Sequence, residues 1–163
     1  VCILWYFTNA VFLRSSFNPV SSIKVFFLRL FGAKIGKGVV IKPAVNIKYP
    51  WKLTVGNHSW LGENVWIDNL DNVIIGNNCC LSQGAMLLCG NHNYKKKTFD
   101  LIIGKIMLED GVWIGSQSIV CPNVTCKTHS VLAVNSVAAN DLEEYAVYRG
   151  NPAKAIRKRV IEQ

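Results

Sequence analysis

The sequence predicts an all-β fold, a triangular prism built from hexapeptide repeats, and two periodicities carry this prediction. Gly36, Gly56 and Gly76 follow one another at intervals of 20 residues, and an aliphatic residue precedes each. Within these units, and again after an interruption, an apolar residue recurs at every sixth position: Ile35, Ile41, Ile47, Val55, Leu61, Ile67, Ile75, Leu81, Leu87, Leu108, Ile114, Val120, Cys126, Leu132 and Ala138. Neither a helix nor an alternating strand has a period of six. A short strand and a turn, repeated three times, instead bring the chain once around a triangle.

A second row of residues supports the prism. Four positions after most of these apolar residues comes a small one: Val39, Val45, Ser59, Val65, Cys79, Ala85, Val112, Ser118, Val124, Ser130 and Ser136. Small side chains fit where three walls converge, and the aliphatic row fills the remaining interior at about 1.5 to 3 kcal/mol per buried side chain. An ordinary β-sandwich would instead need alternating apolar residues and a turn signal about every 8 to 12 residues.

The composition is that of one compact domain. The chain has 163 residues, of which 50% are hydrophobic and 17% charged, and this excludes a disordered or collagen-like chain. The formal net charge of +8 favours an anionic ligand or surface, and we expect no nucleic-acid partner. The six cysteines contain no C-x-x-C pair, so we expect free thiols in a reducing compartment.

The N-terminal segment, residues 1–33, is apolar, and we expect it to be helical. Its longest charge-free stretch, residues 1–13, is shorter than the roughly 18 apolar residues that a spanning helix needs. A signal peptide is not expected either, because no basic region precedes the apolar stretch and no small-residue cleavage site follows it. Two hypotheses remain open: the segment caps the core of the prism, or it lies on a membrane surface.

The six-residue period is interrupted between Leu87 and Leu108. We therefore expect residues 34–140 to form the prism and residues 93–107 to protrude from it as an extended loop. Asn91 and His92 lie at the start of this loop. An imidazole can take a proton from a hydroxyl at neutral pH, so His92 is a candidate general base, and a surface histidine without a role is the alternative.

The other two histidines, His58 and His129, occupy positions whose side chains should face outwards into solvent. A zinc site through three histidines needs a closely spaced pair. The three histidines of this chain lie 34 and 37 residues apart, so we expect no metal.

The C-terminal segment, residues 141–163, is expected to be a basic tail with a short helix. From Arg149 to Arg159 it contains five basic residues and no acidic one. Such a run is either a solvated surface or a contact for phosphate groups.

The repeat and four further segments resemble the hexapeptide-repeat acyltransferases, whose fold is a left-handed parallel β-helix. These segments are residues 30–36 (LFGAKIG), 109–116 (EDGVWIGS), 122–124 (PNV) and 150–154 (GNPAK). The resemblance spans nearly the whole chain and is greatest for the exopolysaccharide O-acetyltransferases of the colanic acid biosynthesis type. It implies acetyl-CoA as the acyl donor, a homotrimer with each active site between neighbouring prisms, and a location in the cytoplasm or at the inner face of the membrane.

The resemblance also implies roles for individual residues. His92 matches the catalytic histidine of the family, and the backbone N–H of Ser116 matches the group that binds the donor carbonyl, where an oxyanion develops. The expected contacts of acetyl-CoA are Trp113, Ser116, Val134, Ala139, Asn140, Lys154 and Arg157, with the two cationic side chains on the phosphates.

The acceptor is expected to be a sugar or oligosaccharide hydroxyl. Gly62 stands where galactoside acetyltransferases carry a sugar-binding asparagine, so the acceptor contacts cannot be carried over from them. The candidates in this chain are Glu63, Asn64, Asp68, Asn69 and Asn91, and a simple corner turn is an equally open interpretation of Asp68 and Asn69. Two other functions stay open: acetyl transfer to an amino sugar or to serine, and a non-catalytic scaffold or binding module.

Overall fold

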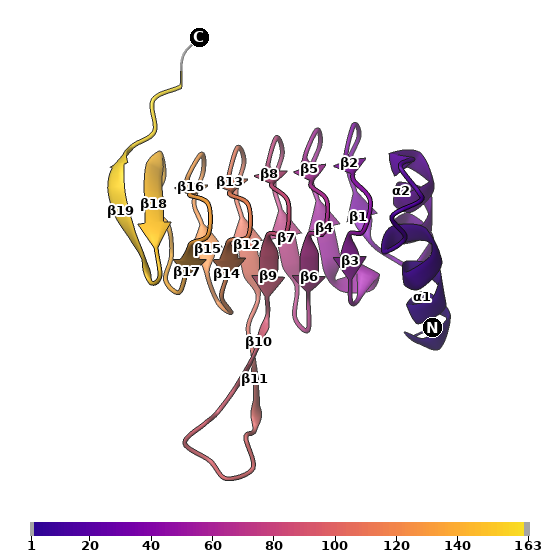
Figure 1. The fold of residues 1–163 in the computed structure, drawn as a ribbon, viewed down its shortest axis with the longest axis horizontal. Coiled ribbons are helices and arrows are strands. Elements are labelled where there is room, and N and C mark those ends of the chain that lie inside the picture. Colours follow the sequence, from indigo (N-terminus) through magenta and orange to yellow (C-terminus); the bar gives the residue numbers. More distant parts are fainter. Residues whose placement is uncertain (1, 162–163) are drawn as a thin grey trace.

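The computed structural model describes residues 2–161 and shows a parallel β-helix with three faces (Figure 1). The first face consists of β1 (Lys34–Ile35), β4 (Leu53–Val55), β7 (Val73–Ile75), β12 (Ile106–Leu108) and β15 (Thr125–Cys126). The second face consists of β2 (Val40–Ile41), β5 (Trp60–Leu61), β8 (Cys80–Leu81), β13 (Trp113–Ile114), β16 (Val131–Leu132), β18 (Ala146–Gly150) and β19 (Ala153–Lys158). The third face consists of β3 (Asn46–Ile47), β6 (Trp66–Asp68), β9 (Met86–Leu88), β14 (Ile119–Val120) and β17 (Val137–Ala138).

Each coil visits the three faces in order, which defines three corners. The first corner joins the first face to the second, the second corner joins the second to the third, and the third corner leads to the next coil. A short 3-10 helix, η2 (Pro50–Lys52), turns the third corner ahead of β4. Equivalent residues of successive coils pair directly, as Ile41 pairs with Leu61 and Leu61 with Leu81.

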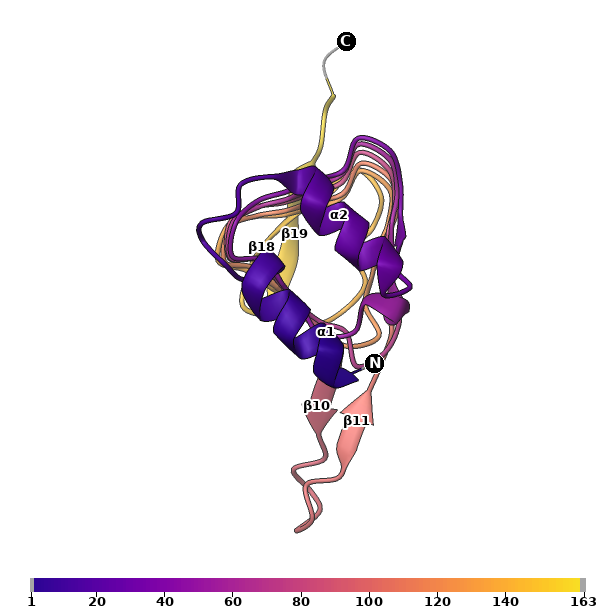
Figure 2. The same cartoon turned by 90° about the vertical axis from the view of Figure 1, so that its right-hand side faces the viewer.

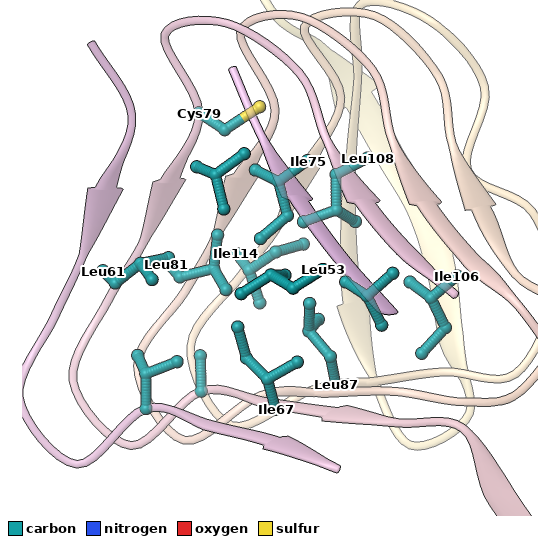
Figure 3. Close-up of a cluster of buried hydrophobic side chains, with 14 of the residues drawn as sticks. Leu53, Leu61, Ile67, Ile75, Cys79, Leu81, Leu87, Ile106, Leu108 and Ile114 are labelled. Carbon is teal, nitrogen blue, oxygen red and sulfur yellow. The ribbon is translucent and has the colours of Figure 1, made fainter. Parts of the chain in front are cut away.

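The interior is made of the residues that the period of six predicts. Every residue of the aliphatic row and of the small-residue row is buried, and Figure 3 shows Leu61, Leu81 and Ile114 side by side inside the coils. The core is therefore a column along the prism, and the predicted fold class is confirmed.

The corners depend on left-handed backbone at one position per turn. In the first corner this position is filled by Gly38, His58, Asn78, Gly111 and His129, and in the second by Ala44, Asn64, Gly84, Gln117 and Asn135. Glycine and asparagine adopt a positive φ at low cost, which explains their recurrence. His58 and His129 are thus turn residues; His58 is exposed, whereas the ring of His129 is half-buried and stacks on Tyr145.

The N-terminal segment caps one end of the prism. α1 (Cys2–Thr8), the π-helix η1 (Asn9–Leu13) and α2 (Ser21–Leu30) lie across the opening of the first coil (Figure 2). Trp5, Leu13 and Leu28 are buried in contact with the core, so the expected cap is present. Among residues 2–161, no helix has the length and apolar content that crossing a membrane requires.

A hairpin leaves the prism at the third corner. β10 (Gly90–His92) and β11 (Leu101–Ile103) pair antiparallel and project away from the coils (Figures 1 and 2). The excursion was expected at residues 93–107, but its first strand begins at Gly90 and β12 resumes the first face at Ile106. The boundaries differ because Ile106 already pairs with Val73 of the preceding coil.

The expected short C-terminal helix is absent from the described residues. Instead, β18 adds a parallel strand beside β16, and β19 returns antiparallel to β18. The turn at residues 151–152 brings the basic run back along the open edge of the second face. The unpaired backbone groups of that edge are thereby satisfied, which a helix at this position would not achieve.

Candidate active site

His92 is held on the first strand of the protruding hairpin. Its side chain is exposed, and its Nδ1 lies 2.7 Å from the carbonyl oxygen of Phe99. A carbonyl only accepts hydrogen bonds, so this contact requires Nδ1 to carry the proton, and the lone pair of the neutral ring then resides on Nε2. The neighbouring Asn91 accepts the backbone N–H of His92 with its side-chain oxygen at 2.8 Å. The geometry therefore leaves Nε2 as the basic atom.

The tip of the hairpin is braced by Asp100. Its carboxylate lies 2.6 Å from Lys96 Nζ and 2.5 Å from the hydroxyl of Thr98, and its carbonyl accepts the N–H of Asn93. The hydrogen bond from Lys96, followed by that from Thr98, lowers the pKa of Asp100 below its usual value. These contacts hold the turn that presents the Phe99 carbonyl to His92.

A groove of about 470 Å³ lies on the second face at the second corner. It brings together four of the residues expected to contact the acyl donor: Trp113, Ser116, Val134 and Arg157. The indole N–H of Trp113 donates to Ser82 Oγ at 2.9 Å, which fixes the ring against the preceding coil. Within residues 2–161, the backbone N–H of Ser116 donates to no protein acceptor, so it is free to bind a carbonyl oxygen.

The remaining donor candidates lie outside this groove. Lys154 is exposed on β19, where it pairs with Arg149 across the strands. Ala139 and Asn140 are exposed after β17, at the third corner of the last coil. The structure thus separates these two residues from Ser116 by the width of the third face.

The acceptor candidates divide between two corners. Glu63 and Asn64 are exposed at the second corner, whereas Asn91 lies with His92 on the hairpin. Asp68 is buried on β6, and its Oδ1 lies 2.9 Å from Lys48 Nζ. The structure corrects the expectation for the last candidate, Asn69.

Asn69 is fully buried and serves the third corner. Its side-chain amide donates to the carbonyl of Tyr49 at 2.6 Å and accepts the N–H of Tyr49 at 2.9 Å. Both ends of the amide are therefore committed to backbone, and Asn69 is not exposed to a sugar. An asparagine is typical of a hydrogen-bonding corner, but whether its side chain points inwards or outwards depends on the local backbone of the coil.

Three residues near the candidate site were not singled out by sequence reasoning. Arg159 lines the groove, and its Nη1 donates to the carbonyl oxygens of Gly111 and His129 at 2.8 and 3.2 Å. Gln83 accepts the hydroxyl of Ser116 at 3.2 Å. Phe99 orients His92 through its carbonyl, and no side-chain signal in the sequence could have indicated that contact.

His92 and Ser116 stand at different corners of the same chain. His92 is on the hairpin of the third corner, whereas Ser116 follows β13 at the second corner, and the whole third face separates them. Within one chain, therefore, these two candidate residues do not come together.

The three buried cysteines offer no alternative nucleophile. All six are free thiols, as expected. Burial raises the pKa of Cys79 and of Cys89 to about 11 and raises that of Cys126 further. Since the thiolate is the reactive form, these thiols are inert at neutral pH.

Comparison with known proteins places the chain in a family. The chain is 38% identical over 157 residues to the colanic acid biosynthesis acetyltransferase WcaF of Escherichia coli K12, a match that covers 96% of this chain and 86% of WcaF. It is 26% identical over 129 residues to the galactoside O-acetyltransferase of the same organism, covering 77% of this chain and 64% of that enzyme. No protein-family model matches the chain.

A solved structure shows the same fold. The crystal structure of a hexapeptide-repeat acetyltransferase of Vibrio cholerae, complexed with acetyl coenzyme A, superposes with a TM-score of 0.82 at 21% identity. The superposition covers 90% of this chain and 81% of that one. Given the WcaF match and this fold, the chain belongs to the hexapeptide-repeat, left-handed β-helix acetyltransferases.

Proposed function

We propose that the protein transfers an acetyl group from acetyl-CoA to a hydroxyl of a sugar or oligosaccharide, with His92 as the general base. The observation that carries the proposal is the contact between His92 Nδ1 and the Phe99 carbonyl, because it leaves Nε2 as a proton acceptor on an exposed hairpin. The sugar is supported by the names of two relatives, a colanic acid biosynthesis acetyltransferase and a galactoside O-acetyltransferase.

The chemistry needs one base and one oxyanion donor. Nε2 of His92 takes the proton of the sugar hydroxyl as its oxygen attacks the thioester carbonyl. The backbone N–H of Ser116 donates to the oxygen that becomes negative in the tetrahedral intermediate. Collapse of the intermediate breaks the carbon–sulfur bond, and the coenzyme A thiolate leaves with the proton that His92 had taken. The ester and free coenzyme A are the products, and no group of the protein is changed.

Because His92 and Ser116 lie at different corners, we propose that the site is completed between copies in a homotrimer. The accessible outward residues of the second face are largely apolar: Val40, Trp60, Cys80 and Trp113, whereas Val131 is buried. Those of the third face are Asn46, Trp66, Met86, Ile119 and Val137. The first face presents the more polar row Lys34, Thr54, Ile74, Met107 and Thr125.

A ring of copies uses two different surfaces of each subunit. An exposed sheet face normally carries polar residues, so two apolar faces indicate contacts with two neighbours. Packing the second face of one prism near the third face of the next would bring the groove of Ser116 towards the hairpin of His92. The trimer is thus part of the mechanism.

We also propose that the N-terminal cap rests on the inner surface of the cytoplasmic membrane. The outer side of α1 and η1 is apolar, with Ile3, Phe7 and Val11 exposed, and α2 exposes Ile23, Phe26 and Leu30. The first 62 residues contain eight Lys and Arg and no Asp or Glu, so they carry the whole formal charge of +8. The positive charge would oppose contact between the caps of two copies. A membrane with anionic lipids attracts this charge and can also bury the apolar side chains.

The transfer is tested by incubating the full chain with acetyl-CoA and a panel of monosaccharides, nucleotide sugars and oligosaccharides, followed by mass spectrometry of the products. A mass increase of one acetyl group, labile to mild base, identifies an O-acetyl ester. A base-stable product on an amino sugar, or on serine, would establish the alternative acceptor instead. If acetyl-CoA fails to bind at about millimolar concentration, the protein is a scaffold or binding module.

Arg157 provides a test of the groove as the donor site. Arg157→Gln removes a cation that lines the groove and should raise the Michaelis constant for acetyl-CoA several-fold, because phosphate contacts with arginine are charge-assisted. Lys97→Gln, at the exposed tip of the hairpin, is the matched control with the same change of charge.

A further inference from the structure

A pocket of about 320 Å³ lies between the N-terminal cap and the third face, apart from the groove of Ser116. In this region α1 runs beside β3 (Figure 1), and the indole N–H of Trp5 donates to the carbonyl of Ile47 at 2.9 Å. Its polar and aromatic lining includes Asn9, Arg14, Lys48, Tyr49, Trp66 and Asp68.

Two residues that line this pocket each have a buried side-chain oxygen with no hydrogen-bond partner among residues 2–161. These atoms are Oδ1 of Asn9 and Oδ1 of Asp68, in side chains of residues that are 7% and 8% exposed. Lys48 Nζ approaches Asp68 Oδ1 to 2.9 Å as an ion pair, but at an angle outside that of a hydrogen bond. The ammonium of Lys48 compensates the charge of Asp68, so Asn9 Oδ1 is the buried acceptor that lacks a donor, although Asn9 Nδ2 donates to Asn46 Oδ1 at 2.8 Å.

The lining suits a sugar ring. Sugar hydroxyls donate hydrogen bonds to carboxylate and amide oxygens, and the apolar faces of a pyranose pack on aromatic rings. Trp66 and Tyr49 supply such rings. The backbone of Tyr49 is fixed on both sides by the buried amide of Asn69, so Asn69 acts on this pocket as a positioning residue.

The charge of the pocket suits an anion. Arg14 and Lys48 outnumber Asp68 as the charged groups of the lining. Arg14 is exposed and its guanidinium makes no hydrogen bond within the described part of the chain, whereas Lys48 is already paired with Asp68. An anionic substituent on the sugar would therefore find one free cation at the rim.

The pocket lies one coil before the strand that leads to His92. Asp68 pairs with Leu88 of β9, and its carbonyl accepts the N–H of Cys89 at 3.2 Å. β10 begins at the next residue and carries His92. A saccharide longer than one unit could occupy this pocket and extend along the third corner towards the base.

We propose that this pocket binds a pyranose with a negatively charged substituent, as a unit of the acceptor. The role of the pocket as an acceptor site rests on the proposed acetyl transfer, but binding of a sugar to the pocket can be measured without that reaction. Glucuronate, glucose 1-phosphate and glucose are the probes, since the first two place the negative charge on a carboxylate or a phosphate and the third has none.

Titration calorimetry or saturation-transfer NMR on the full chain measures the binding. We expect saturable binding of at least one anionic probe, about tenfold weaker in Trp66→Ala. Arg14→Gln should weaken the anionic probes and leave glucose unchanged. Trp60→Ala is the matched control, since Trp60 and Trp66 are both 41% exposed, and Lys37→Gln is the control for Arg14.

The experiments distinguish a wrong assignment of the pocket from a wrong assignment of the reaction. The pocket is refuted if no probe binds up to about 10 mM, if Trp60→Ala weakens binding as much as Trp66→Ala, or if charge makes no difference. Unchanged acceptor Michaelis constants in Trp66→Ala and Arg14→Gln would also refute it while leaving acetyl transfer intact. Binding that survives in His92→Ala supports the pocket, even where the wild type acetylates no sugar.

Discussion

His92 and Phe99 face each other across the base of the turn in the β10–β11 hairpin, with Nδ1 of the imidazole 2.7 Å from the backbone carbonyl. The contact is made by backbone on one side, so it survives any change of the Phe99 side chain that keeps the same conformation. It fixes both the tautomer and the ring orientation of the base.

Replacing His92 by Ala should reduce turnover and leave the binding of acetyl-CoA unchanged. A positioned general base contributes about 10² to 10⁴ in rate, or roughly 3 to 5 kcal/mol of barrier. The control is His58→Asn, which keeps a residue suited to the positive φ of that turn. Equal turnover in His92→Ala on a confirmed acceptor would remove His92 from the mechanism.

Substitutions of Phe99 should distinguish the role of its backbone carbonyl from that of its aromatic side chain. Phe99 has a φ of 48°, in the left-handed region that glycine adopts freely and β-branched residues avoid. Phe99→Val should therefore displace the carbonyl and lower turnover by about tenfold or more, whereas Phe99→Gly should retain most of it. Steady-state kinetics of both variants provides the measurement. Equal losses in the two would show that the aromatic ring, not the carbonyl, is required.

A charged residue on the third face should disrupt the trimer. Met86→Glu places a carboxylate in the apolar outward row between Trp66 and Ile119, where its desolvation would oppose contact with a neighbour. Light scattering after size exclusion should then report monomers, and activity should fall with them. Thr54→Glu on the first face is the control. A wild type that is monomeric at micromolar concentration would contradict the shared site.

The cap should bind vesicles that contain anionic lipid. Co-sedimentation with phosphatidylglycerol-containing vesicles should be strong at low salt and weaker at high salt, and neutral vesicles should retain little protein. The double variant Phe7→Asp and Phe26→Asp, at two exposed positions of α1 and α2, should release the protein. The matched control places the same charges on the hairpin, at Tyr94 and Leu101, which are also exposed. Release by the hairpin variants alone would place the contact there instead.

Lys24 should give the fold a distinctive pH dependence. Its ammonium is buried and donates to the carbonyl oxygens of Ile41 and Lys42 at 3.2 and 2.7 Å. Burial, and then the charge of Lys42, lowers the pKa of Lys24 to about 8. Between that value and the ordinary pKa of 10.5, the unfolded chain holds a proton that the folded chain has released. The contribution of Lys24 to the free energy of unfolding should therefore rise with pH in that interval.

Denaturant unfolding of the wild type and of Lys24→Met measures this contribution as a difference. From about pH 8 to 9 the difference should grow by about 1 kcal/mol in favour of the wild type. The buried thiols of Cys79 and Cys89 do not affect this interval. Their pKa values are raised in the folded protein, so they lower its stability only above the ordinary thiol pKa of 9.0. A difference that stays constant with pH would mean that Lys24 keeps its proton in the folded protein.

The repeating part of the fold could be predicted in detail because each inward position is set by the period alone. Every aliphatic residue from Ile35 to Ala138 in the row of six is buried, since a coil of fixed length returns the same register to the interior. The prediction of a C-terminal helix was wrong because the structure of this segment depends on a distant part of the chain. Residues 153–158 (AKAIRK) are rich in helix-forming residue types, but they pair with β18 at an open sheet edge that only the finished prism creates.

Candidate site residues could be proposed from the sequence where a residue stands out by its chemical type and position, as His92 does at the break in the repeat. Trp113, Val134 and Arg157 are expected only from the family resemblance, and the structure brings them to one groove with Ser116. Asn69 shows the limit, because its amide turns inward to Tyr49. Side-chain direction at a corner depends on the local backbone, and the sequence does not encode it as a pattern.

The hairpin interrupts a coil without interrupting the stack. β12 pairs with β7 in register, Ile106 opposite Val73 and Leu108 opposite Ile75, although the whole excursion separates β9 from β12 along the chain. The strands of neighbouring coils therefore pair in register even though an inserted hairpin lies between them in the sequence. The base and its supporting turn sit in a module that evolution or an engineer can lengthen, shorten or exchange, while the column of aliphatic residues beneath it goes on folding as before.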